Sequence, residues 1–268
     1  MPPTIETGVA AAEESASALV VVPAYNEAAN IIKLIDALVA LPVRVDVLVV
    51  DDKSPDGTGQ LVREHAAFLK RVFLLTRIGP RGFARSCRDG FQWGVKRGYA
   101  VCAQMDADLS HDPADIPRLL ATLEGGADLA VGSRYCGGVR VLNWPVQRLL
   151  LSLFAASYTR ALSGVRLSDP TSGFKAVRTR VLRATDWSRF SVYGYGFQIE
   201  FAFQTCRNGF EIAEVPIVFT ERRLGDSKMS WKIVIESAFR VFALGCYRCF
   251  HRAAGKPAPA HIEAVEFA

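Results

Sequence analysis

The chain has 268 residues, of which 50% are hydrophobic and 22% are charged, and its formal net charge is +5. This is the composition of a globular protein with a substantial core, and the modest positive charge suits an anionic partner without choosing among nucleic acid, a phosphorylated substrate and an anionic membrane surface. A membrane-spanning helix is not expected, because the best apolar run, residues 149–159, is far shorter than the ~20 residues that a span requires.

The two ends of the chain differ in composition from the part between them. Residues 1–17 are rich in Ala and Glu and lack the basic start and apolar block of a signal peptide, so we expect a disordered leader. Residues 253–268 resemble a loose tail, which leaves residues 18–252 as one folded domain without an internal repeat. In the absence of a secretory signal, we expect the six cysteines to be free thiols in a reducing cytoplasm.

One pair of cysteines has a spacing that is found in metal and redox sites. Cys246 and Cys249 form a C-x-x-C pattern with His251 close by. No second ligand pair is present in the sequence, so two cysteines on an apolar helix is the favoured interpretation.

Strand and helix patterns alternate along the first half of the folded domain. Short apolar runs predict strands, and apolar residues with a period near 3.6 predict helices. In chain order the predicted elements are strand 19–22, helix 27–40, strand 45–50, helix 57–69, strand 71–75, helix 83–97, strand 99–105, helix 115–123 and strand 129–131. This alternation predicts an α/β fold with a mainly parallel sheet covered by helices on both faces, in which ligands bind at the carboxyl ends of the strands.

The first two predicted strands end in polar segments. After the first strand comes PAYNE (residues 23–27), in which Tyr25 offers a stacking face and the Glu can begin a helix. The glycine pattern of a dinucleotide-binding fold is absent there, which counts against a dehydrogenase. Asp51 and Asp52 follow the second strand and could bind a base or a ribose hydroxyl, whereas residues 54–58 are equally typical of a turn and a helix N-cap.

Two carboxylates follow the fourth predicted strand. Asp106 and Asp108 are separated by one residue, so in an extended segment both side chains point the same way and can reach one cation. Hard oxygen ligands suit Mg²⁺ or Mn²⁺, with substrate phosphates completing the coordination shell. A lone D-x-D pattern is common in acidic loops, but its place at the end of an apolar strand beside other polar strand ends favours a metal site.

Basic residues occur in three later segments. Arg134, in GSRY after the fifth strand, would lie in the same cleft as the D-x-D pair. Arg148 and Ser152 are four apart in a predicted helix over 145–162, so they share a face that could hold an anionic group. The segment ERRLGDSK (221–228) could form a mobile lid that closes over phosphates. Each segment alone is equally typical of a solvated surface.

The ordered set of these segments resembles the dolichol-phosphate mannose synthases, which belong to the inverting family 2 glycosyltransferases with a GT-A fold. The resemblance covers about residues 19–242, which is nearly the whole folded domain. The segments that carry it are PAYNE, VVDDKSPDGT, MDADLSHDP, GSRY, DPTSGFKA, GYGFQIE and EVPIVFTERRLGDSKMS. Any one segment is loosely specific, whereas the ordered set is specific.

The resemblance implies a role for individual residues. Those expected to bind the sugar nucleotide, GDP-mannose, are Pro23, Tyr25, Glu27, Val50, Asp52, Asp106, Ala107, Asp108, Arg134, Arg222 and Lys228. Asp106 and Asp108 match the metal ligands, and Asp108 and Arg134 are the expected catalytic residues. Arg134, Arg148 and Ser152 match the positions that cradle the acceptor phosphate in related enzymes.

Some positions depart from the family pattern. Certain relatives have a Gln that adds a metal ligand where this chain has Ser110, so the expected metal ligands differ at this position. Residues 79–90 are more basic than is usual, and DPTSGF (169–174) carries Pro and Ser at positions where Leu and Gly are frequent. These changes leave the sugar open.

The predicted activity is transfer of mannose from GDP-mannose to a polyprenyl or dolichyl phosphate by a metal-assisted in-line displacement with inversion. Two alternatives stay open: a related transferase that uses UDP-glucose or another acceptor, and a catalytically silent subunit that binds a nucleotide sugar. Nucleic-acid binding is not expected, because the basic residues are interspersed with acidic ones and no recognition module is present.

A lipid phosphate acceptor implies contact with a membrane. The predicted helices 145–162 and 229–250 carry apolar faces with aromatic residues and basic flanks, which are typical of helices that lie in a membrane interface. Packing on the domain core is the other interpretation. We therefore expect a peripheral protein on the cytoplasmic face of a membrane, and the sequence does not identify any anchoring partner.

Overall fold

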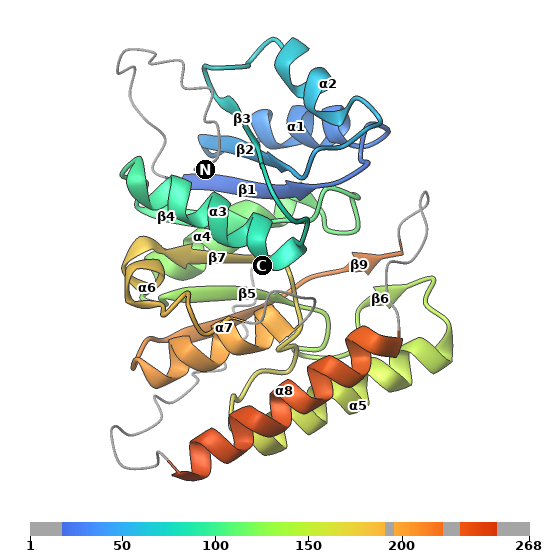
Figure 1. The fold of residues 1–268 in the computed structure, drawn as a ribbon, viewed down its shortest axis with the longest axis vertical. Helices are drawn as coiled ribbons and strands as arrows, with labels where there is room; N and C mark the ends of the chain where they lie inside the picture. The colour runs from blue at the N-terminus through green and yellow to red at the C-terminus, as the bar shows by residue number, and fades with distance from the viewer. Residues whose placement is uncertain (1–17, 191–195, 222–230, 251–268) are drawn as a thin grey trace.

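The central sheet is built from the apolar runs that predicted strands. The structure, a computed structural model, describes residues 18–190, 196–221 and 231–250. Its seven-stranded sheet has the order β3-β2-β1-β4-β7-β5-β8 (Figure 1). The strands are β1 (Ala18–Ala24), β2 (Val45–Asp51), β3 (Val72–Thr76), β4 (Val101–Gln104), β5 (Leu129–Ser133), β7 (Lys175–Arg178) and β8 (Ile212–Pro216).

The sheet is mainly parallel, as the sequence predicted. Every neighbouring pair is parallel except the pairs of β7, which runs antiparallel to both β4 and β5. β7 comes from a part of the chain to which the sequence analysis assigned no element. Its insertion between β4 and β5 places the segment that precedes β7 next to the carboxyl end of β4.

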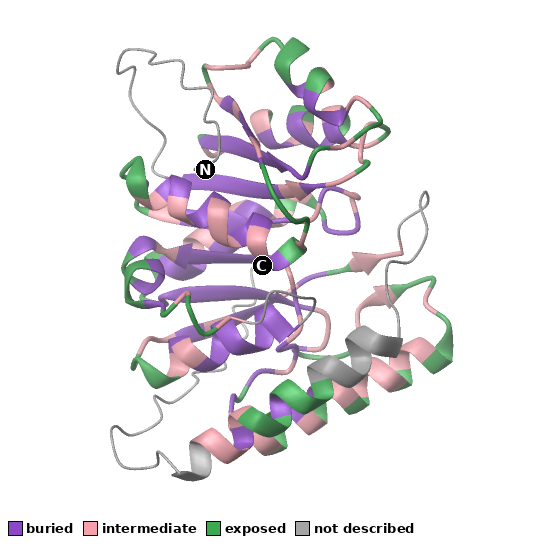
Figure 2. Ribbon diagram, in the orientation of Figure 1, coloured by how far each residue is buried: buried purple, intermediate pink, exposed green. Residues whose placement is uncertain are grey.

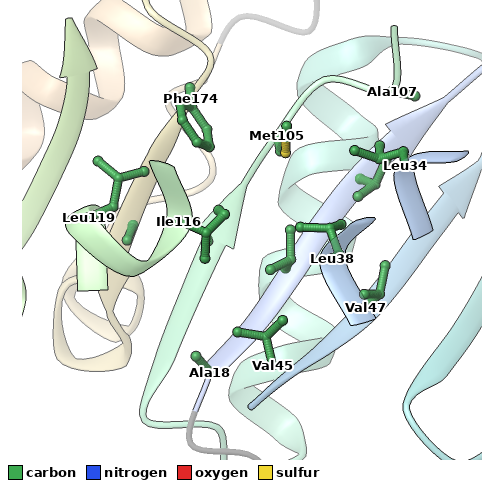
Figure 3. Packing of buried hydrophobic residues seen from close by; sticks show 14 of the residues in the cluster. Ala18, Leu34, Leu38, Val45, Val47, Met105, Ala107, Ile116, Leu119 and Phe174 are labelled. Atoms are coloured by element: carbon green, nitrogen blue, oxygen red, sulfur yellow. The ribbon is translucent and has the colours of Figure 1, made fainter. Parts of the chain in front are cut away.

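Helices cover both faces of the sheet and bury two separate apolar cores (Figure 2). One face is covered by α1 (Ile31–Val39), α2 (Thr58–Glu64) and α4 (Ile116–Glu124), and α4 follows a short 3₁₀ turn, η1 (Pro113–Asp115). The other is covered by α3 (Phe83–Lys96), α6 (Thr179–Ala184) and α7 (Gly196–Arg207). Figure 3 shows the first core, where Leu34 and Leu38 of α1 and Ile116 and Leu119 of α4 pack toward the strands.

Glycines bring α3 close to the sheet. A Cβ atom at Gly90 would lie 2.4 Å from Cγ1 of Val21, and one at Gly94 would lie 2.6 Å from Sγ of Cys102. Larger side chains at these positions would force helix and sheet apart. The second half of α3 is therefore held close to β1 and β4.

A pair of helices and a small ribbon lie beside the main sheet. Strands β6 (Val141–Leu142) and β9 (Phe219–Thr220) pair in parallel, and α5 (Val146–Ser163) packs along α8 (Trp231–Phe250) (Figure 1). The hydroxyl of Tyr158 donates a hydrogen bond to the carbonyl of Ala238 at 3.3 Å. Both helices were predicted, and within the described ranges no helix has the length and apolarity to cross a membrane.

Some boundaries differ from the sequence prediction. The helix expected from residue 27 begins at Ile31, because the Glu27 carbonyl accepts the N–H groups of Asn30 and Ile31 in a preceding turn. The predicted leader (1–17) and tail (253–268) lie outside the described residues. So does His251, whereas Cys246 is a free cysteine on α8.

Candidate active site

The polar segments singled out in the sequence lie at one edge of the sheet. Parallel strands β1, β2, β4 and β5 all end at this edge, and Tyr25, Asp52, Asp106 and Arg134 follow them. The β6–β9 ribbon and the first turns of α5 lie beyond the same edge (Figure 1). The fold therefore brings together residues that are separated by more than a hundred positions in the chain.

The segment after β2 supports the segment after β1. The backbone N–H of Glu27 donates to Oγ1 of Thr58, and that of Ala28 donates to Oδ2 of Asp56, both at 3.0 Å. Oδ1 of Asp56 also accepts a hydrogen bond from the Thr58 hydroxyl at 2.6 Å. This part of the DDKSPDGT segment holds the loop of Tyr25 in place, so its turn chemistry serves the site directly.

Asp52 is engaged by neighbouring groups of the protein. Its carboxylate is buried, forms an ion pair with Arg77, and accepts hydrogen bonds from the N–H of Gly82 and the hydroxyl of Ser86, both at 3.0 Å. Arg77 also donates to Asp89 at 2.8 Å. Although burial opposes the effect, Asp89 and Asp52 raise the pKa of Arg77. The structure thus gives Asp52 an anchoring role for the basic segment 79–90, beside the nucleotide contact that the resemblance implies.

The other residues expected to bind the nucleotide differ in how much of the side chain a ligand can reach. The guanidinium of Arg81 lies 4.4 Å from the centre of the Tyr25 ring, a cation–π contact that covers part of its stacking face. Val50 and Ala107 are buried, so they can offer a ligand little beyond their backbone groups, whereas Pro23 is half-buried.

Asp106 and Asp108 both follow β4 and are half-buried. Oδ1 of Asp108 accepts the N–H of Ser110 at 3.1 Å, and a Cβ atom at Gly173 would lie 3.4 Å from Oδ1 of Asp106. Among the described residues no group of three or more His, Cys, Asp or Glu side chains is arranged to hold a metal. The protein therefore supplies two hard oxygen donors here, which suits a divalent cation that takes its other ligands from a diphosphate and water.

Arg134 forms a bidentate ion pair with a partner that the sequence analysis did not assign. Its Nε and Nη2 atoms donate to the two carboxylate oxygens of Asp169 at 2.6 and 2.7 Å, and Nη2 also donates to Oγ1 of Thr171 at 2.9 Å. The side chain of Asp169 has an exposed fraction of 0%. Although burial opposes it, Arg134 lowers the pKa of this carboxyl. The bidentate geometry fixes the guanidinium plane.

Two arginines share an aromatic cluster. The guanidinium carbon of Arg134 lies 5.3 Å from the Trp144 ring and 5.5 Å from the Phe219 ring, and that of Arg148 lies 4.2 Å from the Trp144 ring. Trp144 and Phe219 meet edge to face at 5.4 Å. Trp144, which the sequence analysis did not single out, therefore lies between the two arginines predicted to hold the acceptor.

Ser152 joins the same cluster. Its Oγ accepts a hydrogen bond from the Tyr135 hydroxyl at 2.6 Å, and burial raises the pKa of that hydroxyl, which keeps it a donor. Arg148 forms an ion pair with Glu221, a second residue without an assigned role in the sequence analysis. The structure thus brings Arg134, Arg148 and Ser152 together. One nitrogen of the Arg148 guanidinium, Nη1, pairs with Glu221.

His111 connects the acidic pair with this cluster. Its ring stacks on Phe174 at 4.9 Å and meets Phe219 edge to face at 5.2 Å. Burial lowers the pKa of His111 to about 4, so the imidazole is neutral at physiological pH. The carbonyl of Ser110 accepts the N–H of Thr220 in β9 at 3.1 Å. The loop after β4 and the ribbon before residue 222 are therefore in direct contact, while Arg222 and Lys228 lie outside the described residues.

Comparison with known proteins gives consistent matches. Residues 19–185 match the family model described as glycosyl transferase family 2. The chain is 45% identical to polyprenol monophosphomannose synthase of Mycolicibacterium smegmatis, over 88% of this chain and 90% of that protein. It is 43% identical to undecaprenyl-phosphate mannosyltransferase of Micrococcus luteus, over 85% and 93%.

Solved structures show the same fold at lower identity. Glucosyl-3-phosphoglycerate synthase from Mycobacterium tuberculosis, in complex with Mn²⁺, uridine diphosphate and glucosyl-3-phosphoglycerate, aligns with a TM-score of 0.61 at 20% identity. The alignment covers 90% of this chain and 82% of that one. This likeness concerns the fold, and it confirms the predicted GT-A architecture.

Proposed function

Because this chain belongs to glycosyl transferase family 2 and, within it, to the polyprenol-phosphate mannose synthases, we propose that it transfers mannose from GDP-mannose to a polyprenyl or dolichyl phosphate. One observation supports this most directly. An acidic pair suited to a metal diphosphate and an arginine-rich cluster suited to a phosphate lie at one edge of the sheet, joined through His111 and Phe219.

The proposed reaction is a single in-line displacement with inversion. An oxygen of the lipid phosphate forms a bond to the anomeric carbon as the bond from that carbon to the diphosphate breaks, and the electron pair leaves with GDP. A phosphate monoester has its second pKa near ~6, so the nucleophile is already ionised at neutral pH. No strong general base is then needed, which agrees with the weak basicity of His111, whose pKa burial lowers to about 4.

Asp106 and Asp108 are the residues that would hold Mg²⁺ or Mn²⁺. When bound, the cation would supply positive charge against the charge that builds up on the leaving diphosphate. Arg222 and Lys228 are proposed to assist from the segment after β9. Arg134, fixed by Asp169, and Arg148 are proposed to orient the anionic acceptor against its repulsion from the donor.

Arg148→Ala is expected to raise the KM for polyprenyl phosphate, because a charge-assisted hydrogen bond of roughly 1.5–3 kcal/mol is lost, which corresponds to about 10- to 150-fold in affinity. The KM for the sugar nucleotide should change little. Steady-state kinetics with each substrate varied in turn would measure both values. Arg160→Ala is the matched control, since Arg160 is an exposed arginine on the same helix. An unchanged acceptor KM in Arg148→Ala would contradict the acceptor site.

The outer face of α5 is the proposed contact with a membrane. Val146, Leu150 and Phe154 follow one another at intervals of four residues and are 69%, 61% and 68% exposed. Arg148 and Ser152 lie on the other side of the helix, about 200° around its axis from that row. α5 would thus separate the bilayer from the acceptor site by about one helix width, ~10 Å. We propose that the protein binds the membrane peripherally, on the cytoplasmic face that the sequence analysis expects.

Leu150→Ser combined with Phe154→Ser is expected to lower binding to vesicles of anionic phospholipid by about tenfold or more, because two exposed apolar side chains are lost from the contact. Flotation at low and high salt measures this. Ile78→Ser is the control. Ile78 is an apolar residue with an exposed fraction of 50%, and it follows β3, which is an edge strand of the sheet. Vesicle binding that is equal in both variants, or absent from the unaltered protein, would rule out this surface.

Incubation of the purified protein with a short polyprenyl phosphate and Mg²⁺ or Mn²⁺ tests the proposed function. GDP-mannose and UDP-glucose are compared as donors. Lipid-linked mannose from GDP-mannose alone is the expected result. Product from UDP-glucose would keep the fold and mechanism but change the donor. No product from either, with nucleotide still bound, would favour another acceptor or a catalytically silent subunit.

A further inference from the structure

A buried lysine lies in the sheet directly behind the acidic pair. Lys175 in β7 is 2% exposed and lies opposite Gln104 of β4 in the antiparallel register. Its ammonium donates a hydrogen bond to Oε1 of Gln198 in α7 and lies 5.4 Å from the centre of the Phe201 ring. We call Gln104, Lys175 and Gln198 the polar layer. They occupy positions between sheet and helix where apolar residues would be usual.

The polar layer reaches the acidic pair through strand geometry. Side chains alternate across a strand, so Asp106 points to the same face as Gln104, and position 173 to the same face as Lys175. The antiparallel register that pairs Gln104 with Lys175, extended by two residues, places Asp106 opposite Gly173, and a Cβ atom at Gly173 would lie 3.4 Å from both Oδ1 of Asp106 and Nε2 of Gln104. Lys175 is therefore the diagonal cross-strand neighbour of Asp106, a relation in which Cα atoms are roughly 7–8 Å apart.

The neighbouring amide groups stabilise the buried charge of Lys175 only in part. Within the described residues, the side-chain amide of Gln104 makes no hydrogen bond through Nε2 or Oε1, and that of Gln198 makes none through Nε2. Burial lowers the pKa of Lys175 to about 8, and Cys87, Asp169 and Asp106 oppose that shift. The ammonium is thus charged at neutral pH, and the two carboxylates at the site edge are among the anions that compensate it. A buried charge without a role in the site would be a net cost to the fold.

We propose that Lys175 is a positioning residue for the Asp106–Asp108 pair, a fixed cation that balances the carboxylates before the donor arrives and so weakens their binding of a free divalent cation. This inference rests on the metal site of the proposed function. Because like charges repel and opposite charges attract, the same cation should favour binding of a nucleotide diphosphate. The site would then select the metal together with the diphosphate over the metal alone.

Lys175→Met is expected to bind free Mn²⁺ about tenfold more tightly than the unaltered chain and metal-free GDP more weakly. Mn²⁺ binding is followed by electron paramagnetic resonance without nucleotide, and GDP binding by calorimetry in the presence of a chelator. Lys175→Arg keeps the charge and should stay within about twofold of the unaltered chain in both measurements. Lys175→Gln, which can still hydrogen-bond Gln198, replaces the Met variant if that protein does not fold.

The expected changes in Mn²⁺ affinity and in GDP affinity have opposite directions. A structural defect would instead lower the affinity for both ligands. Unchanged or weaker Mn²⁺ binding in a folded neutral variant would overturn the inference. Asp106→Asn separates it from the proposed function. If Lys175→Met binds Mn²⁺ equally well after Asp106→Asn is added, or if the unaltered chain binds no Mn²⁺ even with GDP present, the metal site itself is wrong, and the inference falls with it.

Discussion

Asp108→Asn is expected to lower kcat for sugar transfer by about 10³-fold, because the amide keeps the shape of the side chain but removes the charge that would hold a divalent cation at the leaving diphosphate. The amide oxygen can still accept the hydrogen bond that Ser110 donates to Oδ1 at 3.1 Å, so the loop should keep its conformation. The rate is measured as lipid-linked sugar formed from the nucleotide donor at saturating Mg²⁺ or Mn²⁺.

Asp112→Asn is the control for this change. Asp112 is an exposed carboxylate four residues further along, where it caps η1 by accepting the N–H of Ala114 at 2.9 Å. Asparagine caps a helix about as well as aspartate, so this variant should fold and transfer sugar normally. The metal-assisted mechanism is wrong if Asp108→Asn transfers sugar at near the unaltered rate when the metal has been removed by a chelator.

Local sequence patterns were sufficient to predict the strands whose carboxyl ends carry the site residues. Four of the six residues at 45–50 are valine, and β2 is buried along its whole length. The rule that ligands bind at the carboxyl ends of parallel strands was then enough to predict that Asp52, Asp106 and Arg134 share one edge of the sheet. That part of the site follows from the order of strands and from the residue at which each one ends.

The second half of the sheet could not be found in this way. β7 has four residues, Lys175–Arg178, with a cation at each end, and it forms only because β4 and β5 pair with it on both sides. In α7, every residue from Gly196 to Phe203 is buried, so the helix shows little of the one-sided apolar stripe that predicts an amphipathic helix. Both elements are set by contacts between distant parts of the chain.

The sequence analysis also did not predict the ion-pair partners of the site residues. Arg134 and Asp169 are 35 positions apart, and Arg148 and Glu221 are 73 apart, so no spacing rule connects them. Asp169 lay within a segment that carried the family resemblance, which marked it as important but did not name its partner. A sequence with several acidic and basic residues allows many pairings, and only the fold selects among them.

Arg134→Met is expected to lower the free energy of unfolding by about 3–5 kcal/mol at pH 7, because it leaves the buried carboxylate of Asp169 without its cation. It should also abolish acceptor use, since the guanidinium is lost from the aromatic cluster. Urea unfolding followed by circular dichroism measures the stability. Arg189→Met is the control, because the Arg189–Asp186 ion pair is about half exposed on both sides and such pairs contribute ~0–1 kcal/mol.

The dependence of this loss on pH identifies Asp169 as its cause. In the unaltered protein the pKa of Asp169 is lowered, so the stability that it contributes is present above about pH 4, the ordinary carboxyl pKa, and is lost as the pH falls through the folded value. In Arg134→Met, burial without a cation should raise that pKa, so this variant gains protons on folding and becomes relatively more stable in acid. The difference in unfolding free energy between the two proteins should therefore be largest at pH 7 and shrink toward pH 4.5.

A second substitution tests the same cause. Adding Asp169→Asn to Arg134→Met should recover much of the loss of stability at pH 7 without restoring sugar transfer. A loss of stability that is constant with pH and remains after this second substitution would mean that Arg134 stabilises the fold through its aromatic neighbours instead.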